Sequence, residues 1–218
     1  MRMSYLFLMA AGAAFAQHPA PSLPADQALA KLMAGNRRYV QHKEQHPDES
    51  RARRKELESG QHPFAIILGC ADSRVSPELL FDQGLGDLFV IRVAGNIVDD
   101  AILGSIEYAV EHLGTKLIMV LGHEKCGAVS AAVEGGNAPG HLSALVAAIQ
   151  PSVEATRAEP GDKLHNCVIA NARRVARQIS DSEPVLKEAA RNGIKVIAAD
   201  YALDSGKVNL LDEVRTER

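Results

Sequence analysis

Short, continuous runs of apolar residues recur along the chain, and longer segments with helical patterns separate them. The runs at 64–68 (FAIIL), 87–93 (DLFVIRV), 116–122 (KLIMVLG) and 194–199 (IKVIAA) have the length of buried strands. Continuous apolar strands that alternate with helices are typical of a parallel sheet with both faces covered. The pattern therefore predicts an α/β fold with a mostly parallel central β-sheet flanked by helices.

The helical segments carry recognisable start signals. Residues 25–43 have apolar positions at helical spacing, which predicts an N-terminal helical arm with Asp26 able to cap it. Ser76 followed by Pro77 predicts the start of a short helix after the first strand, with Ser76 as its cap. A polar connection, residues 44–63, joins the arm to the first strand. Further helices are predicted over 99–114 and 126–134, with two or three more over 140–192.

The first residues differ in kind from the rest of the chain. A basic residue, an apolar run and small residues at 14 and 16 are typical of a secretory signal with a cleavage site. We therefore expect a signal peptide over 1–16, a flexible lead over 17–24 and one domain over 25–218, in an exported protein that is periplasmic or secreted. The apolar run is shorter than the roughly 20 residues that a stable span requires, so we expect no stable membrane insertion. An uncleaved anchor is the alternative.

The charge distribution excludes some classes of function. The net charge is −3 and the chain has no long run of one sign, so we expect no nucleic-acid partner. The basic stretch 51–58 (RARRKELE) also contains two glutamates, which is typical of a solvated helix face. The chain lacks the glycine-rich loop that binds phosphates in nucleotide hydrolases.

Candidate metal ligands follow two of the predicted strands. Cys70, Asp72 and Arg74 come directly after the first strand, and His123 and Cys126 come after the third. The carboxyl ends of parallel strands meet at one edge of a sheet, where ligands bind. Two thiolates and an imidazole suit a catalytic zinc ion that keeps its fourth position open. The two motifs therefore predict a zinc site.

Other interpretations of these side chains stay open from the residues alone. Export permits disulfides, so Cys70 and Cys126 could be paired instead of metal-bound. A metal-free thiol hydrolase could use either cysteine with His123, and a zinc-binding or redox module would have no catalytic activity. Cys167 lies in an apolar helical pattern and is interpreted as a buried core thiol.

Asp72 and Arg74 suggest that the chain controls what binds at the fourth coordination position of the zinc ion. An aspartate two residues from a ligand can itself become the fourth ligand, and a nearby arginine can hold it away by a paired hydrogen bond. We expect the closed form, with Asp72 as ligand, at acid pH and the open form at alkaline pH. The alternative is a surface ion pair of little energetic value.

The motifs CADSRVSPE (70–78) and GHEKCGAV (122–129), with the segment 81–96 between them, resemble the β-class carbonic anhydrases. The resemblance extends from about residue 25 to the C-terminus. It implies a zinc enzyme that interconverts carbon dioxide and bicarbonate by a zinc-bound hydroxide. It also implies an obligate dimer, so that the protein would be a homodimer or a tetramer of dimers.

The resemblance also implies roles for particular residues. Cys70, His123 and Cys126 would bind zinc, and Asp72 with Arg74 would form the gate. Among the substrate-binding positions, Gln61 would hydrogen-bond the substrate, Phe89 and Tyr108 would line the pocket, and Gly127 would follow the last ligand. Ala94 stands where many relatives have valine, which leaves the shape of the pocket open. A relative with the same site but another small substrate, carbonyl sulfide or carbon disulfide, is an alternative.

Overall fold

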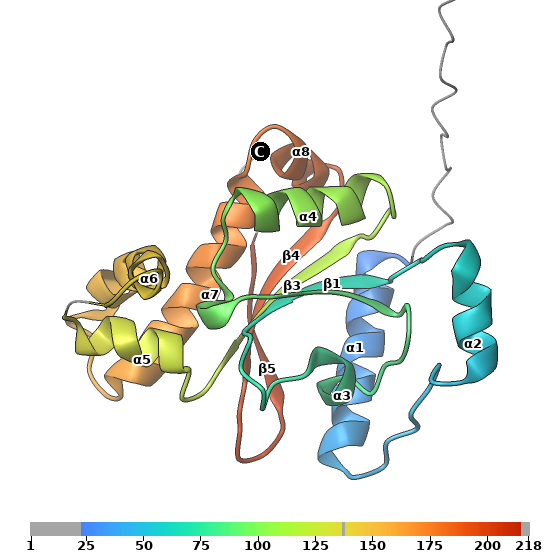
Figure 1. Cartoon of the computed structure of the whole chain (residues 1–218), viewed down its shortest axis with the longest axis horizontal. Coiled ribbons are helices and arrows are strands. Elements are labelled where there is room, and N and C mark those ends of the chain that lie inside the picture. The colour runs from blue at the N-terminus through green and yellow to red at the C-terminus, as the bar shows by residue number, and fades with distance from the viewer. Residues whose placement is uncertain (1–22, 137, 215–218) are drawn as a thin grey trace, which may run out of the picture.

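A computed structural model describes residues 23–136 and 138–214 (Figure 1). The predicted signal peptide, residues 1–16, and most of the predicted lead lie outside the described residues.

The described strands are β1 (Ala65–Gly69), β2 (Leu88–Arg92), β3 (Leu117–His123), β4 (Lys195–Tyr201) and β5 (Val208–Val214). They form one sheet in the order β2-β1-β3-β4-β5. The pairs β1–β2, β1–β3 and β3–β4 are parallel, and β4–β5 is antiparallel. The predicted mostly parallel α/β sheet is confirmed.

Helices cover both faces of this sheet, as Figure 1 shows. The helices of the described residues are α1 (Ala25–Val40), α2 (Arg51–Glu56), α3 (Pro77–Leu80), α4 (Asp100–Glu111), α5 (Gly127–Glu134), α6 (Leu142–Thr156), α7 (Lys163–Asp181) and α8 (Val185–Arg191), with 3-10 turns η1 (Leu57–Ser59) and η2 (Ala94–Asn96). Apolar residues of α1 and α3 pack on one face, and those of α4, α7 and α8 pack on the other. A third cluster joins α5, α6 and the start of α7 next to Cys70 and Cys126.

Apart from His123 at the end of β3, every position of β1 and β3 is apolar, because both faces of these strands are covered. In β1, Ile67 belongs to the cluster under α1, whereas Ile66 and Leu68 belong to the cluster under α4 and α7. All of β1 and all of β3 are buried. This two-sided burial explains why their sequences lack the alternation that a half-exposed strand would show.

The sequence did not predict β5. Its burial pattern alternates only in part, and its middle residues are exposed, because it is an antiparallel strand at the edge of the sheet. The polar connection before β1 also contains α2, whose first turn is capped by Ser50 and which buries none of its residues. The prediction of a solvated helix face at 51–58 is therefore confirmed.

One predicted helix cap is wrong, and the other is confirmed in its position only. The N-cap of α1 is Pro24, without a side-chain hydrogen bond, and the Asp26 carboxylate instead lies 2.7 Å from the Lys195 ammonium of β4. Ser76 is the N-cap residue of α3, as predicted, but its hydroxyl donates to the Glu78 carboxylate at 3.2 Å and makes no hydrogen bond to the helix backbone. In both cases a charged partner competes with the backbone for the side chain. No helix within the described ranges is long and apolar enough to cross a membrane.

Candidate metal centre

The two strands that precede the candidate ligands are neighbours in the sheet. β1 and β3 pair in parallel, with Gly69 opposite Leu121, so their carboxyl ends lie at the same edge. Cys70 follows β1 directly, His123 is the last residue of β3, and Cys126 is the N-cap of α5. Segments more than fifty residues apart in the chain therefore deliver three side chains to one place.

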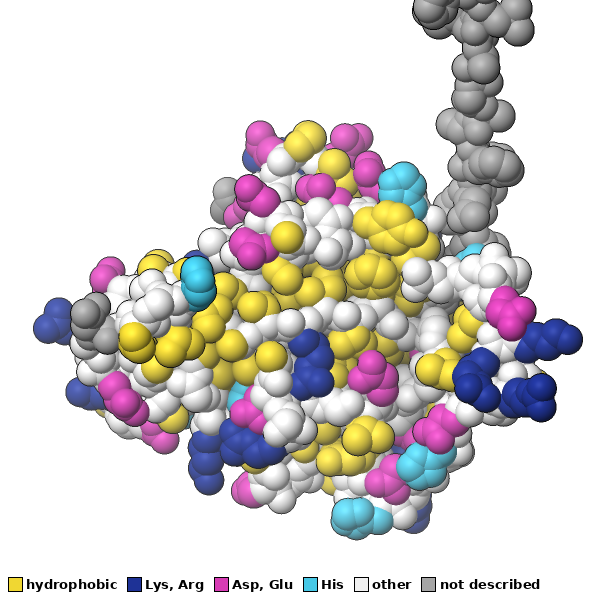
Figure 2. Space-filling model, viewed as in Figure 1, with side chains coloured by type: hydrophobic (Ala, Val, Ile, Leu, Met, Phe, Trp, Pro, Cys, Tyr) yellow, Lys and Arg dark blue, Asp and Glu magenta, His cyan; other side chains and the backbone are white. Residues whose placement is uncertain are grey.

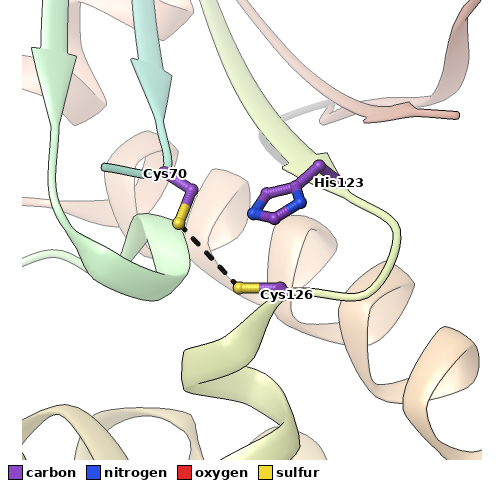
Figure 3. Close-up of side chains that lie close together, drawn as sticks. All are labelled: Cys70, His123 and Cys126. Carbon is purple, nitrogen blue, oxygen red and sulfur yellow. Dashed lines mark hydrogen bonds between the residues drawn. The ribbon is translucent and has the colours of Figure 1, made fainter. Parts of the chain in front are cut away.

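These three side chains point toward one another (Figure 3). One donor atom from each of Cys70, His123 and Cys126 lies within 4.8 Å of the other two. The exposed fractions of the residues are 4%, 0% and 1%. The sulfur atoms of Cys70 and Cys126 are 3.9 Å apart and both cysteines are free, so the alternative of a disulfide between them is wrong for this structure.

The orientation of the His123 ring leaves one nitrogen available as a ligand. Nδ1 lies 2.9 Å from the backbone carbonyl of Glu124 and donates its hydrogen to that oxygen. In the neutral ring Nε2 is then the nitrogen without a hydrogen, and it is buried and has no hydrogen-bond partner among the described residues. A buried lone pair of this kind costs free energy unless something binds it. A metal ion between Nε2 and the two sulfurs satisfies it, and tetrahedral zinc is the ion that this donor set suits.

The charges of the two thiols also fit a divalent cation. A hydrogen bond from Cys126, the neighbouring His123 ring and the Gly95 backbone N–H together outweigh burial and lower the pKa of Cys70 to about 4. The hydrogen bond with Cys70, burial and the charge of Cys70 raise the pKa of Cys126. Two neighbouring thiolates repel each other in this buried place, so without a metal one of them keeps its proton. A divalent cation removes the repulsion and lets both ionise.

Asp72 lies at the open side of the cluster, where Arg74 holds it. Arg74 Nε donates to Asp72 Oδ1 at 2.9 Å and Nη2 donates to Oδ2 at 2.7 Å. Asp72 Oδ2 is also 3.9 Å from His123 Nε2. The hydrogen bonds from Arg74 outweigh burial and hold the pKa of Asp72 below its usual range. The carboxylate is therefore ionised, paired and close to the position that a metal would occupy.

Two contacts that the sequence did not predict support this loop. Arg92, at the end of β2, donates to the backbone carbonyls of Cys70 and Asp72 at 2.9 and 2.6 Å. The backbone N–H of Gly95, in the turn η2, donates to the sulfur of Cys70 at 3.3 Å. In the sequence, only an arginine at the end of an apolar strand and a glycine just after it could have suggested these contacts. Neither residue type indicates which group it would contact.

Comparison with known proteins identifies the family. The carbonic anhydrase family model matches residues 65–208. Carbonic anhydrase 2 of Mycobacterium tuberculosis is 41% identical over 188 residues, which cover 84% of this chain and 91% of that protein. The chain belongs to the β-class carbonic anhydrase family.

Other carbonic anhydrases agree in sequence and in fold. A carbonic anhydrase of Mycolicibacterium smegmatis is 38% identical over 82% of this chain and 89% of its own length. A tetrameric β-carbonic anhydrase of Sordaria macrospora superimposes with a TM-score of 0.70 at 25% identity, over 87% of this chain and 96% of that chain. The β-carbonic anhydrase CafA of Aspergillus fumigatus gives a TM-score of 0.65 at 29% identity, over 86% and 90%.

The remaining predicted site residues do not meet the cluster within one chain. Gln61 is exposed in the connection before β1. Phe89 on β2 and Tyr108 on α4 have ring centroids 6.3 Å apart, and Tyr108 is 47% exposed. Within the part of the chain that the structure describes, no hydrogen bond joins these three residues to the metal ligands.

Gly127 lies beside the cluster, at a cleft between α5 and α6. It is the first residue of α5 after Cys126, and it lines an apolar cleft of about 430 Å³ together with Ala94. A side chain carbon at Gly127 would meet no atom within 4 Å and would project into free space. The glycine therefore leaves that space unoccupied.

Cys167 takes no part in the cluster, as predicted. It is fully buried on α7, and burial raises the pKa of its thiol to about 11.

Proposed function

We propose that Cys70, His123 and Cys126 bind one zinc ion per chain and that this ion carries out the hydration of carbon dioxide to bicarbonate that is typical of the family. The observation that carries the proposal is the unpartnered Nε2 of His123 in a buried cluster where one donor atom of His123 and the two cysteine sulfurs lie within 4.8 Å of one another. Bound zinc supplies a Lewis acid that lowers the pKa of a water ligand from about 15.7 to about 7, which gives hydroxide at neutral pH.

The chain's own residues control access to the metal's fourth position. Arg74 offers Asp72 a cationic partner with two parallel hydrogen bonds, and this geometry holds the carboxylate 3.9 Å from His123 Nε2. If Arg74 releases it, the carboxylate is close enough to become a ligand itself. Asp72 and Arg74 therefore act as a gate, and the pairing of Asp72 with Arg74 supports this role because it keeps the carboxylate available beside the ligands without making it one. The Glu124 carbonyl fixes the His123 ring so that Nε2 faces the ion.

The ligand assignment is tested by zinc quantification together with a carbon dioxide hydration assay. The parent protein is expected to hold one zinc per chain, and Cys126→Ser is expected to lose both the metal and the activity. Cys167→Ser is the matched control, because Cys167 is an equally buried cysteine outside the cluster, and it should keep both. Full zinc occupancy in Cys126→Ser would contradict the assignment.

The same experiments separate the alternatives. A thiol hydrolase that uses Cys70 or Cys126 predicts no stoichiometric zinc. A zinc-binding module predicts zinc without bicarbonate formation. Carbonyl sulfide and carbon disulfide are distinguished from carbon dioxide by assays with each substrate.

The dimer is also part of the proposal. β2 is an edge strand whose outer side has no neighbouring strand in the described chain. Figure 2 shows hydrophobic side chains gathered along the middle of the face over α4, β2 and α5. Large apolar side chains exposed in the chain include Tyr108 on α4 and Leu142 on α6. Contiguous apolar surface of this kind is typical of protein interfaces. We propose that a second copy covers this face and that Gln61, Phe89 and Tyr108 reach the partner's site.

Light scattering and zinc analysis test the dimer together. Tyr108→Glu places a charge on the proposed interface, so it should shift the protein toward monomer, retain zinc and lose activity. Leu210→Glu is the matched control, since Leu210 is 45% exposed on β5, at the opposite edge of the sheet. It should keep the dimer. A fully active Tyr108→Glu monomer would contradict a shared pocket.

Export is the last part of the proposal. The pattern of residues 1–16 supports a cleaved signal peptide and a periplasmic or secreted protein. N-terminal sequencing of the protein from its native host should find a start near Gln17. A cytosolic protein with an intact N-terminus would refute this.

A further inference from the structure

A continuous series of hydrogen bonds, buried from Ser152 onward, runs from the contact between α6 and α7 to the sulfur of Cys70. Arg174 Nε donates to Ser152 Oγ at 2.9 Å, and Ser152 Oγ donates to Asn171 Oδ1 at 3.3 Å. Asn171 Nδ2 donates to the Gly95 carbonyl at 2.8 Å, and the Gly95 N–H donates to Cys70 Sγ at 3.3 Å. Ser152 and Asn171 are each 1% exposed, so water does not compete for these bonds.

The orientation of the Asn171 amide is determined by its neighbours. Its oxygen faces two donors, the Ser152 hydroxyl and Arg174 Nη2, the latter at 3.4 Å. Because donors occupy the oxygen side, the amide nitrogen must point the other way, toward the Gly95 carbonyl. Arg174 is in turn held by the Ala148 carbonyl of α6 and by Gln178. The packing of α6 on α7 therefore determines where the Asn171 N–H points.

Gly95 needs such a restraint because of its conformation. Its φ is +75°, in the left-handed region that favours glycine, and a side chain carbon there would lie 2.7 Å from Ile149 Cδ1. Glycine fits this turn, but it also has the widest backbone freedom of any residue. Asn171 holds the carbonyl on one side of the Gly95 Cα, and the N–H on the other side meets the sulfur. Without Asn171, rotation at Gly95 would remove that N–H from Cys70.

The bond at the sulfur matters for the metal. A thiolate that accepts an N–H donates less charge to the ion it binds, and groups that orient a ligand also determine metal affinity. We propose that Asn171 is a positioning residue for the zinc ligand Cys70, acting through the backbone on both sides of the Gly95 Cα and held in place by Ser152 and Arg174. This inference rests on the proposed assignment of Cys70 as a zinc ligand.

The effect of removing the Asn171 side chain is measured on metal binding and on the absorption spectrum of the bound metal. In Asn171→Ala, the zinc affinity obtained by competition with a chromophoric chelator is expected to fall by about 10- to 100-fold, because losing the orientation of Cys70 outweighs the stronger charge donation of its sulfur. In the cobalt(II)-substituted protein, the thiolate-to-cobalt absorption band is expected to move to longer wavelength, because a sulfur without the N–H gives up charge more readily. A role limited to packing would lower the free energy of unfolding and leave this band unchanged.

Asn166→Ala is the matched control. Asn166 lies on the same helix and also donates from Nδ2 to a backbone carbonyl, that of Pro160 at 3.0 Å, but it has no connection to the cluster. It should keep the parent's zinc affinity and cobalt spectrum. Ser152→Ala, which removes one donor to the Asn171 oxygen, should shift both readouts in the direction of Asn171→Ala by a smaller amount.

The outcomes separate this inference from the proposed function. A parent protein without stoichiometric zinc would overturn both. A zinc-binding parent whose Asn171→Ala variant has unchanged affinity and an unchanged cobalt band would overturn only the role of Asn171. Should Asn171→Ala not fold, Ser152→Ala decides by the same two readouts, and an unchanged spectrum there would equally reject the role.

Discussion

Two aspartate–arginine pairs in this molecule are chemically alike and differ in their surroundings. Asp72 pairs with Arg74 at the metal centre, within one loop. Asp82, just after α3, pairs with Arg38 of α1. The Asp82 side chain is 1% exposed and that of Asp72 is 17% exposed, whereas Arg38 is 26% exposed and Arg74 is 49% exposed.

The difference lies in what else each carboxylate contacts. Both oxygens of Asp82 accept backbone hydrogen bonds, from Gln45 and His46, in addition to the Arg38 guanidinium. Asp72 Oδ2 accepts only from Arg74 among the described residues, and it lies 3.9 Å from the His123 ligand nitrogen. A carboxylate whose two oxygens both accept several hydrogen bonds is held in place. A carboxylate that keeps a free lone pair beside a metal site can bind the metal ion instead of its arginine. The same pair of residue types therefore stabilises the fold in one region, and in the other it leaves a carboxylate oxygen beside the metal ligands, as the proposed gate requires.

The largest expected effect is the loss of the buried pair. Arg38→Ala should lower the free energy of unfolding by about 2–4 kcal/mol, because it leaves a buried charge without its cationic partner. Urea unfolding measures this. The activity per bound zinc should stay near that of the parent, since the pair does not touch the cluster. Arg37→Ala, an exposed neighbour on α1, should leave both quantities unchanged. A comparable loss of stability in Arg37→Ala would show that the pair has no special role.

The second expected effect concerns the gate. Arg74→Ala should lower carbon dioxide hydration by about 10- to 100-fold while zinc stays bound, because Asp72 is then free to occupy the fourth position. A crystal structure of the variant should find the Asp72 carboxylate on the metal. Arg173→Ala is the matched control, since Arg173 also pairs with an aspartate, Asp212, and is 41% exposed. If Arg74→Ala is as active as the parent, Asp72 and Arg74 do not form a gate.

The smallest expected effect is a dependence on pH. Burial opposes the ionised form of Asp82, but Arg38 and the two backbone N–H groups outweigh it and lower its pKa. A carboxyl whose pKa is lowered in the folded protein contributes stability above its unfolded pKa, about 3.9, and loses it as the pH falls through the folded value. Asp82→Asn should therefore cost about 1–2 kcal/mol at pH 7, and the cost should shrink below pH 4.

Urea unfolding of both proteins between pH 3 and pH 7 measures this difference. Zinc release at low pH affects the parent and the variant alike, so it cancels in the comparison. A difference that stays constant down to pH 3 would mean that the charge of Asp82 contributes nothing.

Much of the metal centre could be predicted from local sequence. Cys70 and His123 follow apolar runs that are long enough for buried strands, and parallel strands deliver their carboxyl ends to one edge. Asp72 and Arg74 are two residues apart in the same loop, so their pairing needs no distant partner. The edge strand β5 was missed, because its exposed positions lack the continuous apolar pattern of the central strands.

The amino-acid sequence by itself determined the parallel sheet, the two ligand loops and the pairing of Asp72 with Arg74, because hydrophobic periodicity and short spacings act within a few residues. Only the tertiary structure decided which polar groups support the ligands. Asn171 and Gly95 are 76 residues apart, and the Asp26 carboxylate binds Lys195 instead of capping its own helix. Such contacts form only after packing has brought distant segments together. A side chain's local preference is then outweighed by a buried or charged partner that its own segment does not contain.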